Sequence, residues 1–165
     1  MKLIKLWEAD LDKAYALHQT FEQDENGFMN SAYGLSFEEF KDYVKTRENH
    51  SQGIGLPEGY VSDTVYILED QQQYVGIFNF RHSLNDFLRE GAGHIGYGIS
   101  KEYRGQGYAS NGLKLLIDLI KDDLIEDEIY MSVCKYNTAS LKTQLKNGAY
   151  IHHEDDQHYY TRIKI

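Results

Sequence analysis

The sequence is poor in cysteine, proline and positive charge, and it contains no long hydrophobic run. Its 165 residues include a single cysteine, Cys134, so no disulfide can form within the chain, and we expect a reducing compartment. The apolar stretch at residues 1–7 is short and soon followed by acidic residues, which argues against a signal peptide. No run is long enough to span a membrane. We therefore expect a cytoplasmic protein with no membrane partner.

Positive charge is scarce, since 17 lysines and arginines stand against 26 acidic residues and give a net charge of −9. Nucleic acid is therefore not an expected partner, because binding to a phosphate backbone needs a basic surface. Two segments depart from this pattern: residues 97–117 have a net charge of +2 and residues 129–153 a net charge of +3. These segments indicate a local anion site, and the acidic remainder favours a cationic substrate. A chance distribution of charge is the alternative.

The pattern of apolar residues predicts one α/β (α+β) domain over residues 1–165. Asp10 or Asp12 could cap a first helix that ends near residue 23, and Ser36 with Glu39 forms a capping box for a second. Residues 24–34 are expected to form a loop. Strands are predicted at residues 2–7, 64–68, 74–80, 94–100, 129–135, 149–153 and 158–165, and later helices at 108–124 and 138–146. This order indicates an antiparallel start and a strand–helix–strand centre.

A glycine-containing turn, Arg104–Ala109, joins the strand at 94–100 to the long helix. Unpaired N–H groups at a helix start attract anions, and Gly105 and Gly107 let the backbone wrap closely around one. The segment lacks the lysine of a Walker loop, with Leu113 in its place, and it has Ser110 where a dinucleotide-binding loop has glycine or alanine. A turn that merely ends the strand is the alternative.

The strand before this turn carries two glycines on one face. Alternation places Gly96 and Gly98 with His94 and Ser100, and the bulky residues of the strand on the opposite face. Glycines in such positions indicate close approach of a ligand. A bulky neighbour that crosses the strand would explain them equally well.

These segments resemble the GNAT superfamily of N-acetyltransferases. Arg104-x-x-Gly107-x-Ala109 is similar to the Q/R-x-x-G-x-G/A signature, and Asn137-x-x-Ser140 and the element order agree over nearly the whole chain. Residues 79–85 and 93–97 resemble a bacterial branch of predicted acetyltransferases. The resemblance implies an acyltransferase that uses acetyl-CoA and no metal, with a mostly antiparallel central sheet, flanking helices and central strands that splay at the CoA site.

The resemblance also implies a CoA site. The pantetheine arm would pair with the main chain around Tyr97 and Ile99, and N–H groups of residues 105–110 would hold the pyrophosphate. The residues implied at this site are Tyr97, Gly98, Ile99, Arg104, Gly105, Gln106, Gly107, Tyr108, Ala109, Ser110, Asn137 and Ser140.

Acetyl transfer needs a neutral amine and a proton for the departing thiolate. His94 is the candidate base, with Ser132 as a proton relay, and a structural histidine is the alternative. Many GNAT enzymes carry an acidic tyrosine seven residues after the asparagine, where this chain has Gln144. Tyr136 or Tyr150 could substitute, or the thiolate could leave unaided.

Four residues after the second hairpin strand are candidate substrate contacts, with a solvated loop as the alternative: Arg81, His82, Asn85 and Glu90. A metal at His152–Asp156 is disfavoured, because adjacent histidines in a strand point to opposite faces. The expected partners are acetyl-CoA, a primary amine of a small molecule or peptide in acidic surroundings, and a second copy of the chain in a homodimer. A non-catalytic acyl-CoA-binding module and a nucleotide-dependent enzyme remain open.

Overall fold

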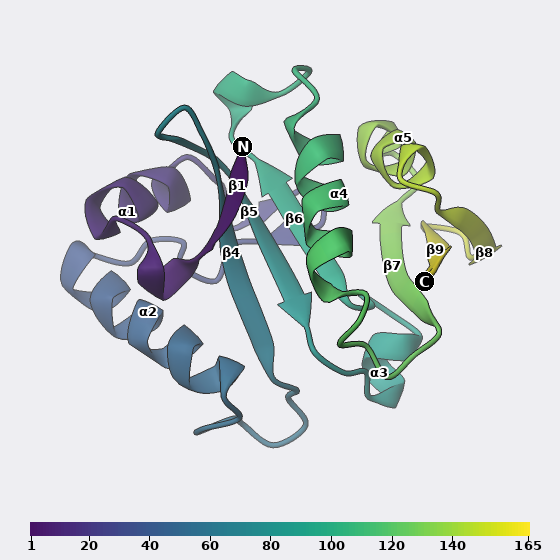
Figure 1. The fold of residues 1–165 in the computed structure, drawn as a ribbon, viewed down its shortest axis with the longest axis horizontal. Coiled ribbons are helices and arrows are strands. Elements are labelled where there is room, and N and C mark those ends of the chain that lie inside the picture. The colour runs from purple at the N-terminus through teal and green to yellow at the C-terminus, as the bar shows by residue number, and fades with distance from the viewer.

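The computed structural model describes all 165 residues and divides the long strands between two antiparallel sheets (Figure 1). The first sheet has the order β1 (Lys2–Lys5), β4 (Asp63–Asp70), β5 (Gln73–Arg81), β6 (Ile95–Ile99). The second has the order β7 (Glu128–Cys134), β9 (His158–Lys164), β8 (Tyr150–Glu154). A short hairpin is formed by β2 (Asp24–Glu25) and β3 (Phe28–Met29).

Helices cover both faces of the first sheet. The helices of the chain are α1 (Leu11–Gln19), α2 (Phe37–Ser51), α3 (Asp86–Arg89), α4 (Tyr108–Ile120) and α5 (Thr138–Lys146), with the 3-10 turns η1 (Leu6–Glu8) and η2 (Lys101–Tyr103). Figure 1 shows α1 and α2 on one face and α4 on the other, with α5 beside the second sheet. None of these helices has the length and apolar character needed to cross a membrane.

Alternation along β4 and β5 builds two hydrophobic cores. One core lies between the sheet and α4. It includes Tyr66, Leu68, Phe78 and Phe80 from the strands and Leu113 and Leu116 from α4. The other core lies between the sheet and the helices α1 and α2. It includes Val65, Ile67 and Ile77 from the strands, Leu17 from α1 and Phe40 from α2. Because successive strand residues point to opposite faces, two central strands hold both helical layers in register.

The helix starts follow local capping chemistry. The Asp10 carboxylate accepts a hydrogen bond from Lys13 N at 2.9 Å at the start of α1. The reciprocal bonds of the capping box between Ser36 and Glu39 are both present at the start of α2. These predictions are confirmed, because capping depends on residues only three positions apart.

The segment after α1 differs from the prediction. Helix α1 ends at Gln19 because the Asn30 amide donates to His18 O and Phe21 O, at 3.0 and 3.2 Å, and so holds the chain as it leaves the helix. Residues 24–34 were expected to be a loop, yet they contain the β2–β3 hairpin. Its turn uses Asn26 and Gly27, both with positive φ, which is the geometry that Asn-Gly favours in tight hairpins.

The two sheets part at β6 and β7. These strands are connected through α4 and point the same way in Figure 1. They are joined where β6 begins and near the middle of β7, by an isolated bridge between Gly93 and Met131 and by a hydrogen bond from His94 N to Tyr130 O at 2.7 Å. Beyond this bridge they belong to separate sheets, so the edge of β6 that faces β7 has no strand partner. The predicted splay of the central strands is confirmed.

Candidate active site

The free edge of β6 presents main-chain groups to the gap between the sheets. Ser100 N donates to Val75 O at 3.0 Å and Arg81 N donates to His94 O at 2.8 Å, so even-numbered residues of this stretch face β5. The main chain of Tyr97 and Ile99 therefore faces the gap. Ile99 O already accepts a hydrogen bond from Arg104 Nε at 2.9 Å. The Tyr97 N–H and C=O and the Ile99 N–H are left for an extended ligand.

The turn after β6 leads into a helix start that no side chain caps. Gly105 and Gly107 have φ values of 75° and 84°, which side chains other than glycine rarely adopt. Gly107 is the N-cap of α4, and no side chain caps the helix there. The first N–H groups of α4 are thus free for an outside acceptor, at the positive end of the helix dipole. This donor set fits a pyrophosphate.

A cleft of about 430 Å³ lies between the β6 edge, this turn and α5; we call it the cofactor cleft. All the residues implied at the CoA site line it, with the exception of Gln106. The Gln106 amide instead donates to Glu102 O at 3.0 Å, and its side chain is exposed. At this position only the main-chain N–H, which was the group expected to meet the pyrophosphate, is left for a ligand.

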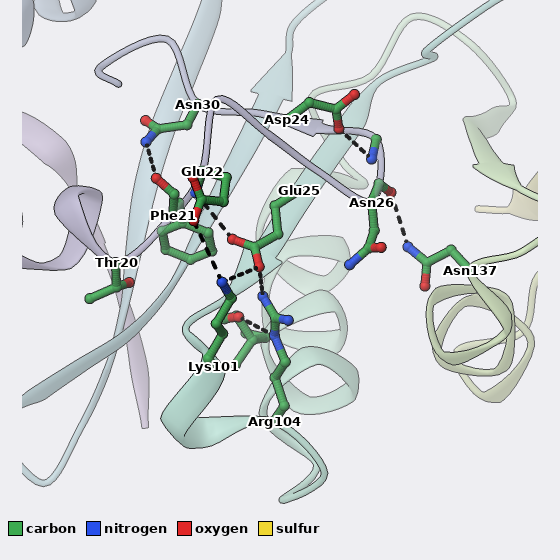
Figure 2. Close-up of polar contacts among 12 residues, drawn as sticks. Thr20, Phe21, Glu22, Asp24, Glu25, Asn26, Asn30, Lys101, Arg104 and Asn137 are labelled. Atoms are coloured by element: carbon green, nitrogen blue, oxygen red, sulfur yellow. Dashed lines mark hydrogen bonds and ion pairs between the residues drawn. The ribbon is translucent and has the colours of Figure 1, made fainter. Parts of the chain in front are cut away.

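The β2–β3 hairpin is fastened to the cofactor cleft by Glu25 (Figure 2). The Glu25 side chain is only 8% exposed, and its Oε1 lies 2.8 Å from Arg104 Nη2 and 3.5 Å from Lys101 Nζ. Burial acts to raise the pKa of Glu25, but hydrogen bonds from Arg104 and from the Glu22 backbone, with the two positive charges, outweigh it and hold this pKa below its ordinary value. The Arg104 guanidinium at the mouth of the turn is thus fixed in place by its ion pair with Glu25.

Asn137 is also engaged with the protein. Its Oδ1 accepts from Ser140 N at 3.1 Å and caps α5. Its Nδ2 donates to Asn26 O at 3.1 Å, as Figure 2 shows. The side chain lines the cleft, but its polar atoms mainly hold α5 and the hairpin in place.

A second cavity of about 410 Å³ adjoins the cofactor cleft; we call it the acceptor cavity. The two share Asn26, Tyr97, Asn137 and Ser140 in their walls. The acceptor cavity is bounded by the β2–β3 hairpin, β5, β6, β7 and β9, and Ser132 and Arg81 line it. No aspartate or glutamate lines it, so the wall itself does not supply the acidic surroundings expected for the substrate.

Three of the four candidate substrate contacts lie outside the acceptor cavity. His82 Nε2 lies 2.8 Å from Thr64 Oγ1, and burial lowers the pKa of His82. Asn85 is the N-cap of α3, where its Oδ1 accepts from Leu88 N, and Glu90 is exposed at the end of that helix. The side chain of Asn85 therefore caps α3, and none of these three residues reaches the acceptor cavity.

His94 is a structural histidine rather than a base. It is fully buried, does not line the acceptor cavity, and has both ring nitrogens occupied. Nδ1 accepts from Tyr130 N at 2.9 Å, so the proton sits on Nε2, which lies 3.2 Å from Glu126 Oε2. Burial lowers the pKa of His94, and the bond and charge of Glu126 offset this only in part. No lone pair is free to take a substrate proton.

Gln144 is buried in a polar chain that ends at Tyr97. Thr161 Oγ1 donates to Gln144 Oε1 at 2.7 Å, Gln144 Nε2 donates to Ser140 Oγ at 3.4 Å, and the Tyr97 hydroxyl lies 2.8 Å from Ser140 Oγ. Burial raises the pKa of Tyr97, although hydrogen bonds from Ser140, Gln144 and Thr143 act against it. Tyr97 thus places a protonated hydroxyl where the two cavities meet.

The tyrosines expected to substitute at position 144 lie elsewhere. Tyr136 is 69% exposed and lines neither cavity. The Tyr150 hydroxyl donates to Glu128 Oε1 at 2.7 Å, also outside both cavities. The candidate role of Tyr136 as the acid is therefore wrong, and Tyr97, expected only to contact the cofactor, is the tyrosine at the junction.

Sequence reasoning missed the hairpin wall, which contributes Asn26, Gly27, Phe28 and Met29 to the acceptor cavity. The Asn-Gly pair was the available signal for a tight hairpin. It also missed Asn79, His158 and Tyr160, which β5 and β9 bring to the same cavity. Only the three-dimensional arrangement joins these strands, so no local pattern could indicate them.

Glycine stands at positions 96 and 98 of β6 for two different structural reasons. A Cβ at Gly98 would lie 2.8 Å from a Phe21 ring carbon and 2.9 Å from one of Phe28, so here the bulky-neighbour explanation holds. A Cβ at Gly96 would meet nothing within 4 Å, and Gly96 lines the acceptor cavity. Only Gly96 keeps space for a ligand.

The splayed strands, the uncapped helix start and the adjoining acceptor cavity define a CoA-dependent acyltransferase. Residues 2–150 match the family described as the acetyltransferase (GNAT) domain, and the chain therefore belongs to this family. The predicted family and fold class are confirmed.

Several solved structures share the fold at low identity. The microcin C7 self-immunity acetyltransferase MccE, solved with acetyl-CoA and AMP, has a TM-score of 0.69 and 14% identity over 94% of this chain and 87% of its own. The Campylobacter jejuni N-acetyltransferase PseH, solved with acetyl-CoA, has a TM-score of 0.63 and 16% identity over 99% of this chain and 97% of its own. A chimeric spermidine N-acetyltransferase SpeG from Vibrio cholerae has a TM-score of 0.64 and 17% identity over 99% of this chain and 94% of its own. No curated protein matches the chain.

The buried position of His94 predicts how its replacement will behave. His94→Gln should lower the free energy of unfolding by roughly 1–3 kcal/mol, because the Tyr130 N–H and Glu126 lose well-placed partners. Thermal denaturation measures this loss. The pH profile of acetyl transfer should keep its shape. A variant of normal melting temperature that lost one limb of the profile would restore His94 as the base.

The β6 glycines provide a matched pair. Gly98→Ala should lower the melting temperature, since its methyl group must displace the Phe21 and Phe28 rings, and overpacking of this kind costs about 1–3 kcal/mol. Gly96→Ala should leave the melting temperature unchanged but reduce turnover, because its methyl group enters the acceptor cavity. Equal loss of stability in both variants would contradict this assignment.

Proposed function

We propose that this chain is an acetyl-CoA-dependent N-acetyltransferase that acetylates a primary amine of a small molecule or peptide. One observation carries the proposal: a cleft along the free β6 edge and the uncapped start of α4 opens, at Tyr97, into a second cavity. When bound, acetyl-CoA supplies an activated acetyl thioester. The structures of MccE and PseH, each solved with acetyl-CoA, support this choice of cosubstrate.

The cofactor site is proposed to act mainly through its backbone. The Tyr97 main chain would receive an extended pantetheine arm, and N–H groups between Gly105 and Ser110 would bind the pyrophosphate. Arg104 and Lys101 would contribute indirectly, because their ion pairs with Glu25 hold the turn and the hairpin together. Ser140 would orient the Tyr97 hydroxyl at the junction.

The amine is proposed to react in its neutral form without a strong protein base. No carboxylate lines the acceptor cavity to stabilise an ammonium group, and the positive charge of Arg81 disfavours a second cation there. His158 is the imidazole in the cavity wall, and its Nδ1 lies 3.6 Å from Asp155 Oδ1. We propose that His158, with Ser132 nearby in the same wall, passes the released proton to solvent.

The Tyr97 hydroxyl is proposed to stabilise the negative charge that develops on the leaving sulfur. The pKa of Tyr97 is raised by burial, whereas a free thiol has a pKa of about 8.5, so complete proton transfer to sulfur is unfavourable. A hydrogen bond to that charge still lowers the barrier.

The rival is a non-catalytic acyl-CoA-binding module, suggested by Gln144 in place of the family tyrosine. Release of free CoA thiol in the presence of an amine panel separates the two. We further propose one domain over residues 1–165, a cytoplasmic location and a homodimer. The edge strand β8, exposed at every residue, supports a dimer, because an unpaired edge can pair with a second copy.

Two glycines with positive φ and open surroundings allow a controlled test of the CoA site. Gly107→Asp should weaken acetyl-CoA binding at least tenfold, because it places a carboxylate at the proposed pyrophosphate site. Gly148→Asp is the control, since Gly148 has φ 88° and lies outside the cofactor cleft. Calorimetry measures both dissociation constants. Equal affinity for acetyl-CoA in the two folded variants would refute the proposed pose.

A second test concerns the leaving group. Tyr97→Phe should reduce kcat by about 100-fold, the lower end of the range for loss of one hydrogen-bond donor to a developing charge. Acetyl-CoA affinity should change little, because the main chain makes the cofactor contacts. Tyr136→Phe, at an exposed position, is the control. Unchanged kcat in Tyr97→Phe would indicate that the thiolate leaves unaided.

A further inference from the structure

Arg81 stands in the acceptor cavity without an acidic partner. Its side chain makes one hydrogen bond, from Nη1 to Gly93 O at 3.1 Å, and it takes part in no ion pair. Asp63 is its cross-strand neighbour on β4, but the Asp63 carboxylate is bonded to Arg47. Burial lowers the pKa of Arg81 and Asp63 acts against this, so the guanidinium stays charged. The remaining N–H donors of a partly buried fork are therefore unpaired.

The rest of the cavity wall does not balance this charge. None of its residues is an aspartate or glutamate, so the wall supplies no carboxylate to the Arg81 guanidinium, and a ligand can supply one. A guanidinium fork binds a planar carboxylate through two parallel hydrogen bonds, and it does so best where water is limited. The acidic surface of the chain as a whole therefore does not describe the charge of this cavity.

Asn79 supplies the second half of the site. Its Oδ1 is buried and has no hydrogen-bond partner, and the residue lines the acceptor cavity. Asn79 lies opposite Gly96 on β6, two residues before Arg81 on the same face of β5, and it lines the same cavity as Tyr97. An unpaired acceptor oxygen at this place suits the N–H of an amine that approaches the cofactor cleft. Two residues of strand separate it from Arg81 by about 7 Å.

We propose that the acceptor is an amine that also carries a carboxylate, with the carboxylate bound by Arg81 and the amine directed by Asn79 toward Tyr97. This inference rests on the proposed acetyltransferase function and adds the chemical class of its substrate. A polyamine such as the spermidine named for SpeG fits poorly, because a second ammonium group would meet Arg81 and no carboxylate. The two anchoring groups favour a chain that separates amine and carboxylate by several bonds.

The test compares ω-amino acids from 3-aminopropanoate to 6-aminohexanoate with their carboxamides and with diamines of equal length. Release of CoA thiol gives kcat/KM for each. The acids should exceed both the carboxamides and the diamines by about 10–100-fold, the range expected for a hydrogen-bonded charge. Arg81→Met should abolish this preference, mainly through KM. Arg89→Met is the control, since Arg89 pairs with Glu126 outside the cavity, and it should keep the preference.

Binding measurements separate this inference from the proposed function. If no amine is acetylated, the proposed function fails, and titration of N-acetylated 5-aminopentanoate and its carboxamide into CoA-loaded protein still tests the site. Tighter binding of the acid that is lost in Arg81→Met supports the site; equal binding of acid and carboxamide overturns it. Should Arg81→Met not fold, Arg81→Lys keeps the charge without the fork and should show an intermediate preference. Carboxamides or diamines that match the acids at every length overturn the proposal.

Discussion

The unpaired edge of β6 is the constraint on which the candidate site depends. Backbone N–H and C=O groups withdrawn from water need partners, and β7 provides them only at the Gly93–Met131 bridge. Beyond the bridge the sheets diverge, so the Tyr97 main chain must bind solvent or a ligand. The helix that connects the strands begins at this same gap, and its free N–H groups lie at the end of the edge. One break in sheet pairing thus brings together a strand edge and a helix start whose backbone groups are both free for a ligand.

The positive charges near this gap serve mainly to assemble it. Lys101 and Arg104 converge on Glu25, which is withdrawn from solvent and held ionised by them. Removal of one partner from such a group leaves an uncompensated charge, so the cluster fixes the hairpin against the cofactor turn. The hairpin is also a wall of the acceptor cavity, and Asn137 bonds it to α5. Acceptor and cofactor surfaces are therefore built on shared supports.

Local signals predicted the parts of this architecture that depend on neighbouring residues. The capping of α1 and α2, the glycine turn before α4 and the alternation of β6 all follow from residues a few positions apart. The roles of His94 and Gln144 could not be predicted in this way. His94 is fixed by Glu126, 32 residues later, and Gln144 by Thr161 on another strand. Whether a polar residue serves a site or a core depends on such distant partners, which one sequence does not reveal.

Gln144 shows how the site can function without the tyrosine common at this position. A buried amide needs both its donor and its acceptor satisfied, and Thr161 and Ser140 satisfy them. Ser140 is thereby held next to the Tyr97 hydroxyl. The ring of Tyr97 stacks on the Phe78 ring, with the two ring centroids 5.5 Å apart. The phenol is fixed from two sides, so little orientational entropy is lost when it meets a developing charge. A hydroxyl supplied by β6 can therefore act at the junction that a hydroxyl on α5 would otherwise reach.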